Sequence, residues 1–218
     1  MTTAAVDQSR AEAPIVHVVD DDEAVRKATE RVLGAAGFAV RTYGSADAFL
    51  SAFEAGTPGC IVLDVRMPGS SGTELQTMMA ARDDRIPIIF LTGHAEVPES
   101  VRAIQRGAID YLLKPVDAPV LIDAVSRALA RDNVDRATRA NRRMLQARYE
   151  RLTPREREVF AHLIGGQINK QVAADLNITE RTIKLHRARI FEKLEVDSMA
   201  SLVRLAIDLE IAPASLDS

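Results

Sequence analysis

The feature that most constrains the fold is a series of short apolar runs alternating with segments of helical periodicity over residues 15–130. Runs such as Ile86–Leu91 are almost continuously apolar and rich in β-branched residues, which is typical of strands buried on both faces of a parallel sheet. The predicted strands are Ile15–Val19, Phe38–Thr42, Cys60–Leu63, Ile86–Leu91 and Ala108–Leu113, and the predicted helices are Glu23–Ala36, Ser45–Glu54, Gly72–Ala81, Val97–Arg106 and Asp117–Ala130. The alternation predicts an α/β domain with a doubly wound, five-stranded parallel sheet.

After residue 130 the sequence predicts only helices. Residues 131–151 carry seven arginines, three acidic residues and no glycine or proline, so we expect a helical linker that extends the preceding helix. Its heptad pattern is too short to decide whether two copies pair as a coiled coil. Four more helices are predicted, from Pro154 to Gly165-Gly166, from Asn169 to about Leu176, from Thr179 to about Leu194 and from Ser198 to about Glu210. They predict an all-α four-helix domain over 152–210, between the linker and a C-terminal tail of 211–218.

Composition narrows the class of protein further. The one cysteine, Cys60, excludes an internal disulfide framework and lies in an apolar run, so we expect it to be a small buried hydrophobe. Residues 1–14 are polar, which predicts a flexible N-terminus rather than a signal peptide. No apolar stretch approaches the ~20 residues that a membrane-spanning helix needs. We therefore expect a soluble, cytoplasmic protein with no membrane partner.

Polar residues stand where four of the predicted strands end. Asp20-Asp21-Asp22 follows the first strand, Asp64 closes the third, Thr92 closes the fourth and Lys114 follows the fifth. In doubly wound sheets function gathers at the carboxyl ends of the strands. Converging carboxylates repel one another unless a cation binds, and hard oxygen ligands suit Mg²⁺. A carboxylate beside Mg²⁺ can accept a phosphoryl group, although a single strand-end acid is more often a helix cap.

Residues 15–130 resemble the receiver domain of two-component response regulators of the FixJ type. The matching segments are Val18–Arg26, Val62–Gly69, Leu91–His94 and Gly107–Pro115. The resemblance implies a flavodoxin-like receiver fold that is phosphorylated on Asp64. It implies that Mg²⁺ is held by Asp20, Asp21, Asp64 and the backbone carbonyl of Arg66, and that Thr92, Tyr111 and Lys114 contact the phosphoryl group or relay its arrival. It leaves Asp22 as a helix cap, gives His94 a structural or surface role and implies a cis peptide bond between Lys114 and Pro115.

The predicted helix, tight turn and longer helix after residue 168 form a helix-turn-helix, whose second helix enters the major groove of DNA. Six basic and three acidic residues lie between Ile168 and Lys193, a balance that a solvated helix face would also show. The segments Leu152–Val159, Asn169–Ala173 and Arg181–Arg187 resemble the LuxR-type helix-turn-helix. The predicted DNA-binding residues are Lys170, Thr179, Arg181, Thr182, Lys184, Arg187 and Arg189. Lys184 is the first candidate for a base edge, and Lys170 and Arg187 for the phosphate backbone.

Together the two resemblances imply a transcription factor and not an enzyme. They imply that a sensor histidine kinase phosphorylates Asp64 and that the receivers then form a homodimer. They also imply that the paired domains bind double-stranded promoter DNA and, with RNA polymerase as partner, activate transcription. A Mg²⁺-dependent phosphohydrolase with Asp64 as nucleophile is an alternative, but such enzymes usually carry a second acid where this chain has Arg66. A receiver that takes no phosphate is a third alternative, against which the complete set of acids, Thr92 and Lys114 argues.

Overall fold

The computed structural model describes residues 13–82, 85–93 and 97–214, with residues 97–100 described by their backbone alone. The chain divides into two compact units, Met1–Asp135 and Arg136–Ser218. One helix, α5 (Ala118–Glu150), begins in the first unit and ends in the second, so the linker does continue the last helix of the α/β unit. Among the described residues, no helix combines the length and apolar character that crossing a bilayer requires.

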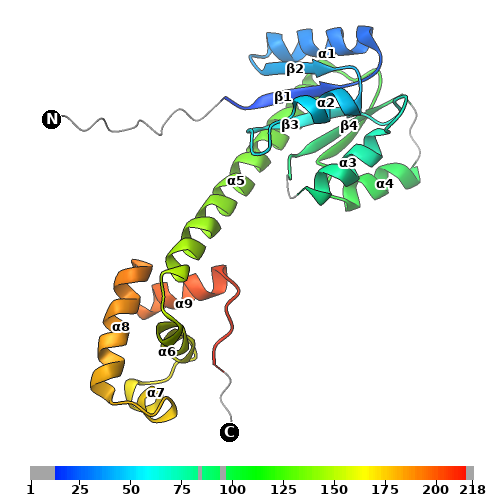
Figure 1. The fold of residues 1–218 in the computed structure, drawn as a ribbon. Helices are drawn as coiled ribbons and strands as arrows, with labels where there is room; N and C mark the ends of the chain where they lie inside the picture. Colours follow the sequence, from blue (N-terminus) through cyan, green and yellow to red (C-terminus); the bar gives the residue numbers. More distant parts are fainter. Residues whose placement is uncertain (1–12, 83–84, 94–96, 215–218) are drawn as a thin grey trace, which may run out of the picture. The chain divides into compact units, whose positions relative to one another are not determined.

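The first unit contains a five-stranded parallel sheet in the order β2-β1-β3-β4-β5. Its strands are β1 (Ile15–Val19), β2 (Ala39–Tyr43), β3 (Gly59–Asp64), β4 (Ile88–Thr92) and β5 (Asp110–Leu113). Its other helices are α1 (Glu23–Ala35), α2 (Ala46–Ala52), α3 (Gly72–Ala81) and α4 (Val97–Gln105). The chain winds outward from β1 to β2 and then across the sheet to β5 (Figure 1), which confirms the predicted doubly wound topology.

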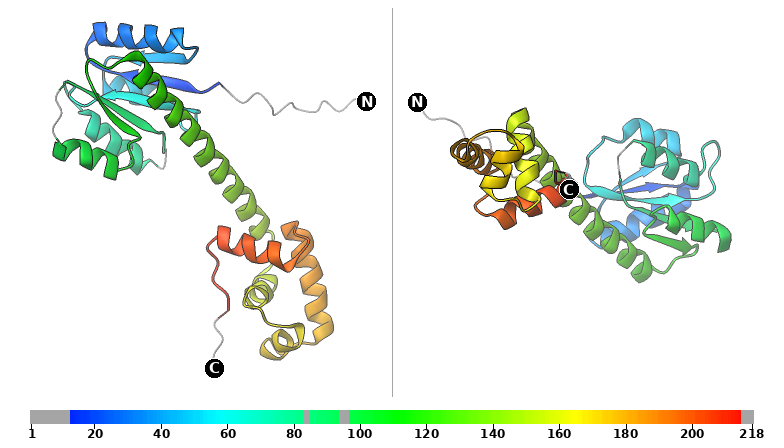
Figure 2. Two further views of the ribbon diagram at one scale, coloured as in Figure 1. Left: turned by 180° about the vertical axis from the view of Figure 1, so that it is seen from behind. Right: turned by 90° about the horizontal axis from the view of Figure 1, so that it is seen from below.

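Alternate side chains of the central strand β3 enter two apolar layers, one on each face of the sheet. Ile61 and Leu63 belong to the layer built with α2, α3 and α4. Cys60 and Val62 belong to the layer built with α1 and α5, which Figure 2 shows on the same face of the sheet. This two-sided burial is the physical reason that the strands read as continuous apolar runs.

Cys60 is the small buried hydrophobe that the sequence predicts. Its side chain is fully buried in the layer formed with α1 and α5. Burial, with a smaller contribution from the charge of Asp132, raises the pKa of the thiol to about 12. The thiolate, which is the reactive form of cysteine, is therefore strongly disfavoured in the folded protein.

Three strands begin later than predicted: β2, β4, which starts at Ile88 and not Ile86, and β5. In β2 and β5 the reason is that the first predicted residues serve the preceding helix. The N–H of Phe38 donates to the carbonyl of Leu33 and closes α1, so β2 starts at Ala39. The N–H of Ala108 donates to the carbonyl of Ala103 in the same way after α4, so β5 starts at Asp110. An apolar pattern indicates which residues are buried, but it does not indicate which carbonyl a backbone N–H bonds to. A prediction made from that pattern therefore extends the strands into these turns.

The second unit consists of the end of α5 and four helices, as predicted. These are α6 (Pro154–Ile164), α7 (Asn169–Asp175), α8 (Glu180–Leu194) and α9 (Met199–Asp208). Helix α6 starts with a capping box, in which the Thr153 hydroxyl accepts the N–H of Glu156 and the Glu156 carboxylate accepts the N–H of Thr153. One apolar core, which includes Phe160, Ile183 and Leu202, joins the helices.

The turn between α7 and α8 follows from two residues. Asn177 has a φ of 52°, in the left-handed region that Asn tolerates better than most residues, and it ends α7. Thr179 then caps α8, since its side chain accepts the N–H of Thr182 at 3.2 Å. The two helices are thereby joined in the predicted helix-turn-helix.

A buried histidine lies in β1, outside any predicted site. His17 is 2% exposed and its ring contacts those of Tyr43, Phe49 and Phe53. Its Nδ1 lies 3.2 Å from the Tyr43 hydroxyl, and its Nε2 is buried without a hydrogen-bond partner. Burial, helped by the nearby charge of Arg41, lowers the pKa of His17 from 6.5 to about 4.

This pKa predicts a loss of stability in mild acid. Between pH 6.5 and about 4, His17 takes up a proton in the unfolded chain but not in the folded one, so falling pH favours unfolding. The slope from one such proton is at most about 1.4 kcal/mol per pH unit. In urea unfolding across this window, the stability of a His17→Phe variant should fall less steeply than that of wild type. Parallel curves would show that His17 does not titrate in this way.

Candidate phosphoacceptor site and DNA-binding helix

The predicted site residues of the first unit come from four strands that neighbour one another in the sheet. Asp20 follows β1, Asp64 ends β3, Thr92 ends β4 and Lys114 follows β5. Because the strands are parallel, all four residues lie at one edge of the sheet. The α/β topology thus brings together residues that are up to 94 positions apart.

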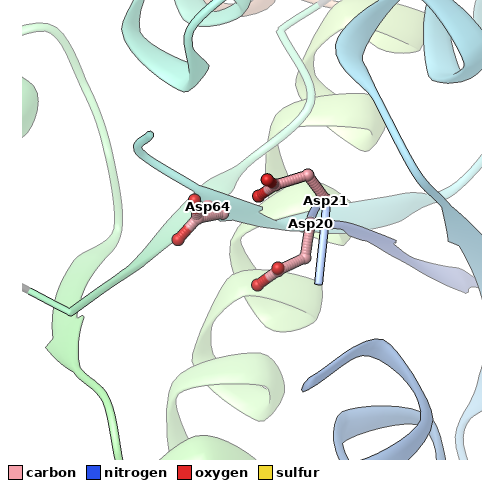
Figure 3. Close-up of side chains that lie close together, drawn as sticks. All are labelled: Asp20, Asp21 and Asp64. Atoms are coloured by element: carbon pink, nitrogen blue, oxygen red, sulfur yellow. The ribbon is translucent and has the colours of Figure 1, made fainter. Parts of the chain in front are cut away.

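Three carboxylates gather at this edge. Asp20, Asp21 and Asp64 each offer an oxygen, and these oxygens all lie within 4.8 Å of one another (Figure 3). Asp20 and Asp64 are buried, whereas Asp21 is exposed and leaves the cluster open to solvent. Hard oxygen donors at this spacing, with an open side for water, suit Mg²⁺. The donor set therefore fits the predicted metal.

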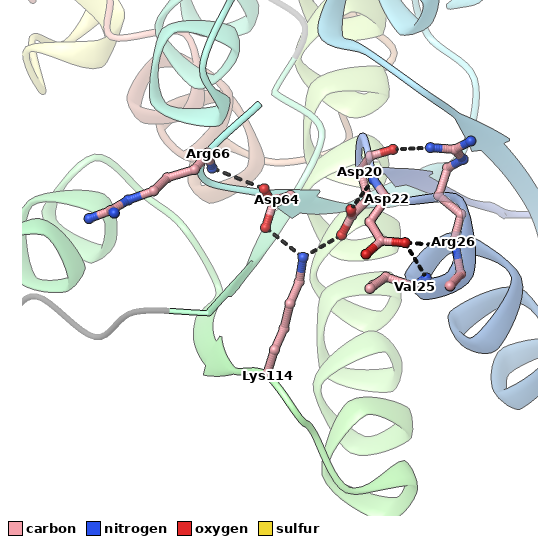
Figure 4. Close-up of polar contacts among 8 residues, drawn as sticks. Asp20, Asp22, Val25, Arg26, Asp64, Arg66 and Lys114 are labelled. Atoms are coloured by element: carbon pink, nitrogen blue, oxygen red, sulfur yellow. Dashed lines mark hydrogen bonds and ion pairs between the residues drawn. The ribbon is translucent and has the colours of Figure 1, made fainter. Parts of the chain in front are cut away.

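Lys114 bridges two of the acids. Its Nζ lies 2.5 Å from Asp20 Oδ2 and 2.7 Å from Asp64 Oδ1 (Figure 4). Burial, the largest influence, raises the pKa of Asp64, and Lys114 acts in the opposite direction. Burial is also the largest influence on Lys114 and would lower its pKa, but hydrogen bonds to and charges on Asp20 and Asp64 together raise it. Lys114 is therefore held in its charged form.

Backbone and side-chain contacts fix the acids from below. The N–H of Arg66 donates to Asp64 Oδ2 at 3.0 Å, and the N–H of Asp22 donates to Asp20 Oδ1 at 2.9 Å. Asp22 itself caps α1 by accepting the N–H groups of Ala24 and Val25, which confirms its predicted role. The guanidinium of Arg26 donates to the carbonyl of Asp20 at 2.6 Å (Figure 4).

Two residues that position the acids, Arg26 and Gly72, are not predicted from the sequence. Arg26 lies within the segment that carries the family resemblance, but its bond to the carbonyl of Asp20 has no sequence signature. Gly72 is the first residue of α3, and a Cβ there would lie only 2.2 Å from the carbonyl oxygen of Asp64. The only available signal was the position of a glycine at a predicted helix start.

The remaining predicted residues of the first unit lie beside this cluster. Thr92 is buried, and its carbonyl accepts the N–H of Lys114 at 2.8 Å. Tyr111 is half-buried, with its hydroxyl inside the protein and its ring 5.9 Å from that of Phe90. The peptide bond between Lys114 and Pro115 is cis, as the resemblance implies. His94, for which the resemblance implies a structural or surface role, lies outside the described residues.

In the second unit, α8 separates into a buried and an exposed side. Ile183, Ile190 and Leu194 are buried in the core. The exposed side of α8 includes three of the predicted DNA-binding residues, Arg181, Lys184 and Arg189. Two further residues, Leu185 and Ala188, are also exposed. Leu185 is apolar, yet half of its surface is exposed.

Several polar residues of α8 are already engaged within the unit. The hydroxyls of Thr179 and Thr182 lie 2.9 Å apart at the helix cap. The Arg187 guanidinium lies over the ring of Phe191, 5.4 Å from its centroid. Lys193 donates to the buried carboxylate of Glu156 at 2.6 Å. Arg181, Lys184 and Arg189 therefore remain the most available cations of the exposed side of this helix.

Comparison with protein families assigns both units. Residues 16–126 match the response regulator receiver domain, and residues 150–206 match the luxR family of bacterial regulatory proteins. The chain belongs to the response regulators. It is a two-component response regulator with a LuxR-type DNA-binding domain, and its function is the regulation of transcription.

Relatives and solved structures agree over nearly the full chain. The transcriptional regulatory protein FixJ of Azorhizobium caulinodans is 42% identical, covering 91% of this chain and 94% of that protein. Nodulation protein W of Bradyrhizobium diazoefficiens is 39% identical, covering 91% of this chain and 87% of that protein. The structure of the response regulator StyR has a TM-score of 0.80 at 43% identity, covering 90% of this chain and 99% of that one. The structure of full-length FixJ from B. japonicum has a TM-score of 0.56 at 38% identity, covering 91% of this chain and 98% of that one.

The contact at Gly72 predicts that this position accepts no side chain. In Gly72→Ala the new methyl group would force the start of α3 away from Asp64, which should cost about 1–3 kcal/mol of unfolding free energy and weaken Mg²⁺ binding. Gly34→Ala, in the last turn of α1 where no atom lies within 4 Å of the added methyl group, is the matched control and should leave stability unchanged or raise it. Denaturation and Mg²⁺ titration of both variants measure this, and equal behaviour would contradict the close contact.

Proposed function

We propose that this response regulator is switched by phosphorylation of Asp64, dimerises through its receiver and then binds promoter DNA to activate transcription. The observation that carries the proposal is the convergence of Asp64 with Asp20, Asp21 and Lys114 at one edge of the sheet. Its relatives are transcriptional regulators, which favours a signalling role for this cluster over a phosphohydrolase.

Phosphoryl transfer needs a nucleophile and neutral surroundings for the charge that the group brings. A carboxylate oxygen of Asp64 bonds to phosphorus as the bond from phosphorus to the kinase histidine nitrogen breaks, and the histidine leaves with the bonding electron pair. Asp20, Asp21, Asp64 and the carbonyl of Arg66 would hold Mg²⁺, which neutralises charge on the phosphoryl oxygens. Lys114, already 2.7 Å from Asp64, would turn its ammonium to one of these oxygens.

Thr92 and Tyr111 would carry the signal away from Asp64. The Thr92 hydroxyl would donate to a phosphoryl oxygen and draw the end of β4 inward. Tyr111 lies on the neighbouring strand, in register with Phe90, and its buried hydroxyl position would then be the favoured one. The exposed apolar residues Val101, Ile104, Leu113 and Val120 lie on α4, β5 and α5, and they support a receiver dimer formed by this face.

Labelling with a small phosphodonor tests the acceptor. Acetyl phosphate with Mg²⁺ should add one phosphoryl group to wild type, seen by intact mass, and shift the protein towards dimer in light scattering. Asp64→Asn should remove both effects, because an amide cannot accept the group. Asp22→Asn is the matched control, since Asp22 caps α1 and should leave labelling intact. Undiminished labelling of Asp64→Asn would refute the assignment.

DNA binding is proposed for the exposed side of α8. Arg181, Lys184 and Arg189 supply positive charge, and the exposed Leu185 next to Lys184 supplies an apolar group suited to a thymine methyl. Lys170 at the start of α7 and Arg187 would hold phosphates, while Thr179 and Thr182 would combine capping with DNA contact. Promoter binding by a dimer and contact with RNA polymerase complete the proposed activation.

The DNA-binding proposal predicts a position-specific effect of Lys184. With a site selected from random DNA, Lys184→Ala should weaken binding by roughly 5- to 100-fold and relax sequence preference at one position, because a base-edge contact is lost. Lys27→Ala removes the same charge from exposed α1 and should change neither quantity. Fluorescence anisotropy measures both, and a uniform loss across all sequences would instead assign Lys184 to the phosphate backbone.

A further inference from the structure

A cavity lies at the other end of the sheet, away from Asp64. It has a volume of about 530 Å³ and is lined by the segments that lead into β4 and β5, by the end of α3, the turn after α4 and part of α5. Since β4 and β5 begin here and the phosphoacceptor cluster lies where strands end, the two sites are distinct. The volume falls within the roughly 300–1,000 Å³ typical of small-molecule sites.

The side-chain amide of Gln76, in the cavity wall, has a buried oxygen with no hydrogen-bond partner among the described residues. Gln76 is 5% exposed, and its Nε2 donates to the carbonyls of Ala103 at 3.2 Å and Arg106 at 3.5 Å. Because both partners are acceptors, the amide nitrogen must face them, and Oε1 is left buried with no partner. A buried acceptor without a donor is costly, so a ligand N–H or O–H that reached Oε1 after a small shift of the Gln76 side chain would gain a strong contact.

Three arginines, Arg85, Arg106 and Arg131, are among the described residues that line the cavity. Arg131 is paired with Asp135, with its Nε 2.8 Å from Oδ2. No ion pair joins Arg85 or Arg106 to another described residue, and both side chains are exposed at the cavity rim. Two guanidinium groups at one rim, neither paired with a described acid, are suited to a phosphate or carboxylate, which they bind through paired N–H donors.

The remaining wall is apolar. Met79, Ile86, Pro87 and Ile109 contribute hydrophobic surface to the cavity wall. Such a surface suits a flat ring rather than a hydrated inorganic ion. We propose that this cavity binds a small aromatic anion, a ring that bears a hydrogen-bond donor for Gln76 and a phosphate or carboxylate for Arg85 and Arg106. The binding is independent of phosphorylation at Asp64.

Titration of the full-length ¹⁵N-labelled protein tests this proposal. The probes are AMP and anthranilate, each with a ring, an N–H donor and an anionic group, and inorganic phosphate serves as the bare anion. We expect saturable binding of AMP or anthranilate, with shifts of the Gln76 side-chain amide and the Ile109 backbone amide, and much weaker binding of phosphate. Absence of saturable binding by both probes at millimolar concentration, or equal affinity for phosphate, would overturn the proposal.

Charge-neutral variants locate the ligand. Arg85→Gln and Arg106→Gln, both at exposed positions that do not endanger folding, should each weaken binding about tenfold because a charge-assisted hydrogen bond is lost. Arg82→Gln lies near but does not line the cavity and should bind as wild type. Asp64→Asn should also bind normally, which separates this site from the phosphoacceptor cluster. Unchanged affinity in both cavity variants would place the ligand elsewhere and refute the site.

Discussion

The arrangement of the receiver depends on the ion pairs of Lys114 with Asp20 and Asp64. Three carboxylates within 4.8 Å of one another repel, at an effective dielectric constant of about 20, by roughly 3 kcal/mol or more for each pair of charges. Lys114 offsets part of this repulsion with distances of 2.5 and 2.7 Å to two of the acids. It does so from β5, so the balance of charge ties together strands at the centre and the edge of the sheet. A metal ion and a phosphoryl group would enter a site in which Lys114 already neutralises part of the negative charge.

Much of the fold could be predicted because it rests on burial that the sequence records directly. Strands covered on both faces must be apolar at every position, and β3 is buried along its whole length from Gly59 to Asp64. Helix starts were predictable for a similar reason, since Thr153 and Glu156 form the capping box at the expected residues. The placement of Asp64 and Lys114 at one edge followed from topology alone.

The rest depends on side-chain partners that no local pattern encodes. Lys193 counts as a basic residue of the DNA-binding region, but it is paired internally with Glu156 across the domain. The orphaned amide of Gln76 and the tight contact at Gly72 arise from the way that helices dock on the sheet.

Because Cys60 is buried, the rate at which its thiol is modified reports on local opening of the folded protein. Its thiol has no exposed surface and a pKa of about 12, so a thiol reagent reaches it in molecules in which α1 or α5 has moved away from the sheet. Because no second cysteine exists, every modification event reports on this one position. The rate of modification would therefore measure how often the layer of α1 and α5 over β3, the strand that ends in Asp64, opens under native conditions.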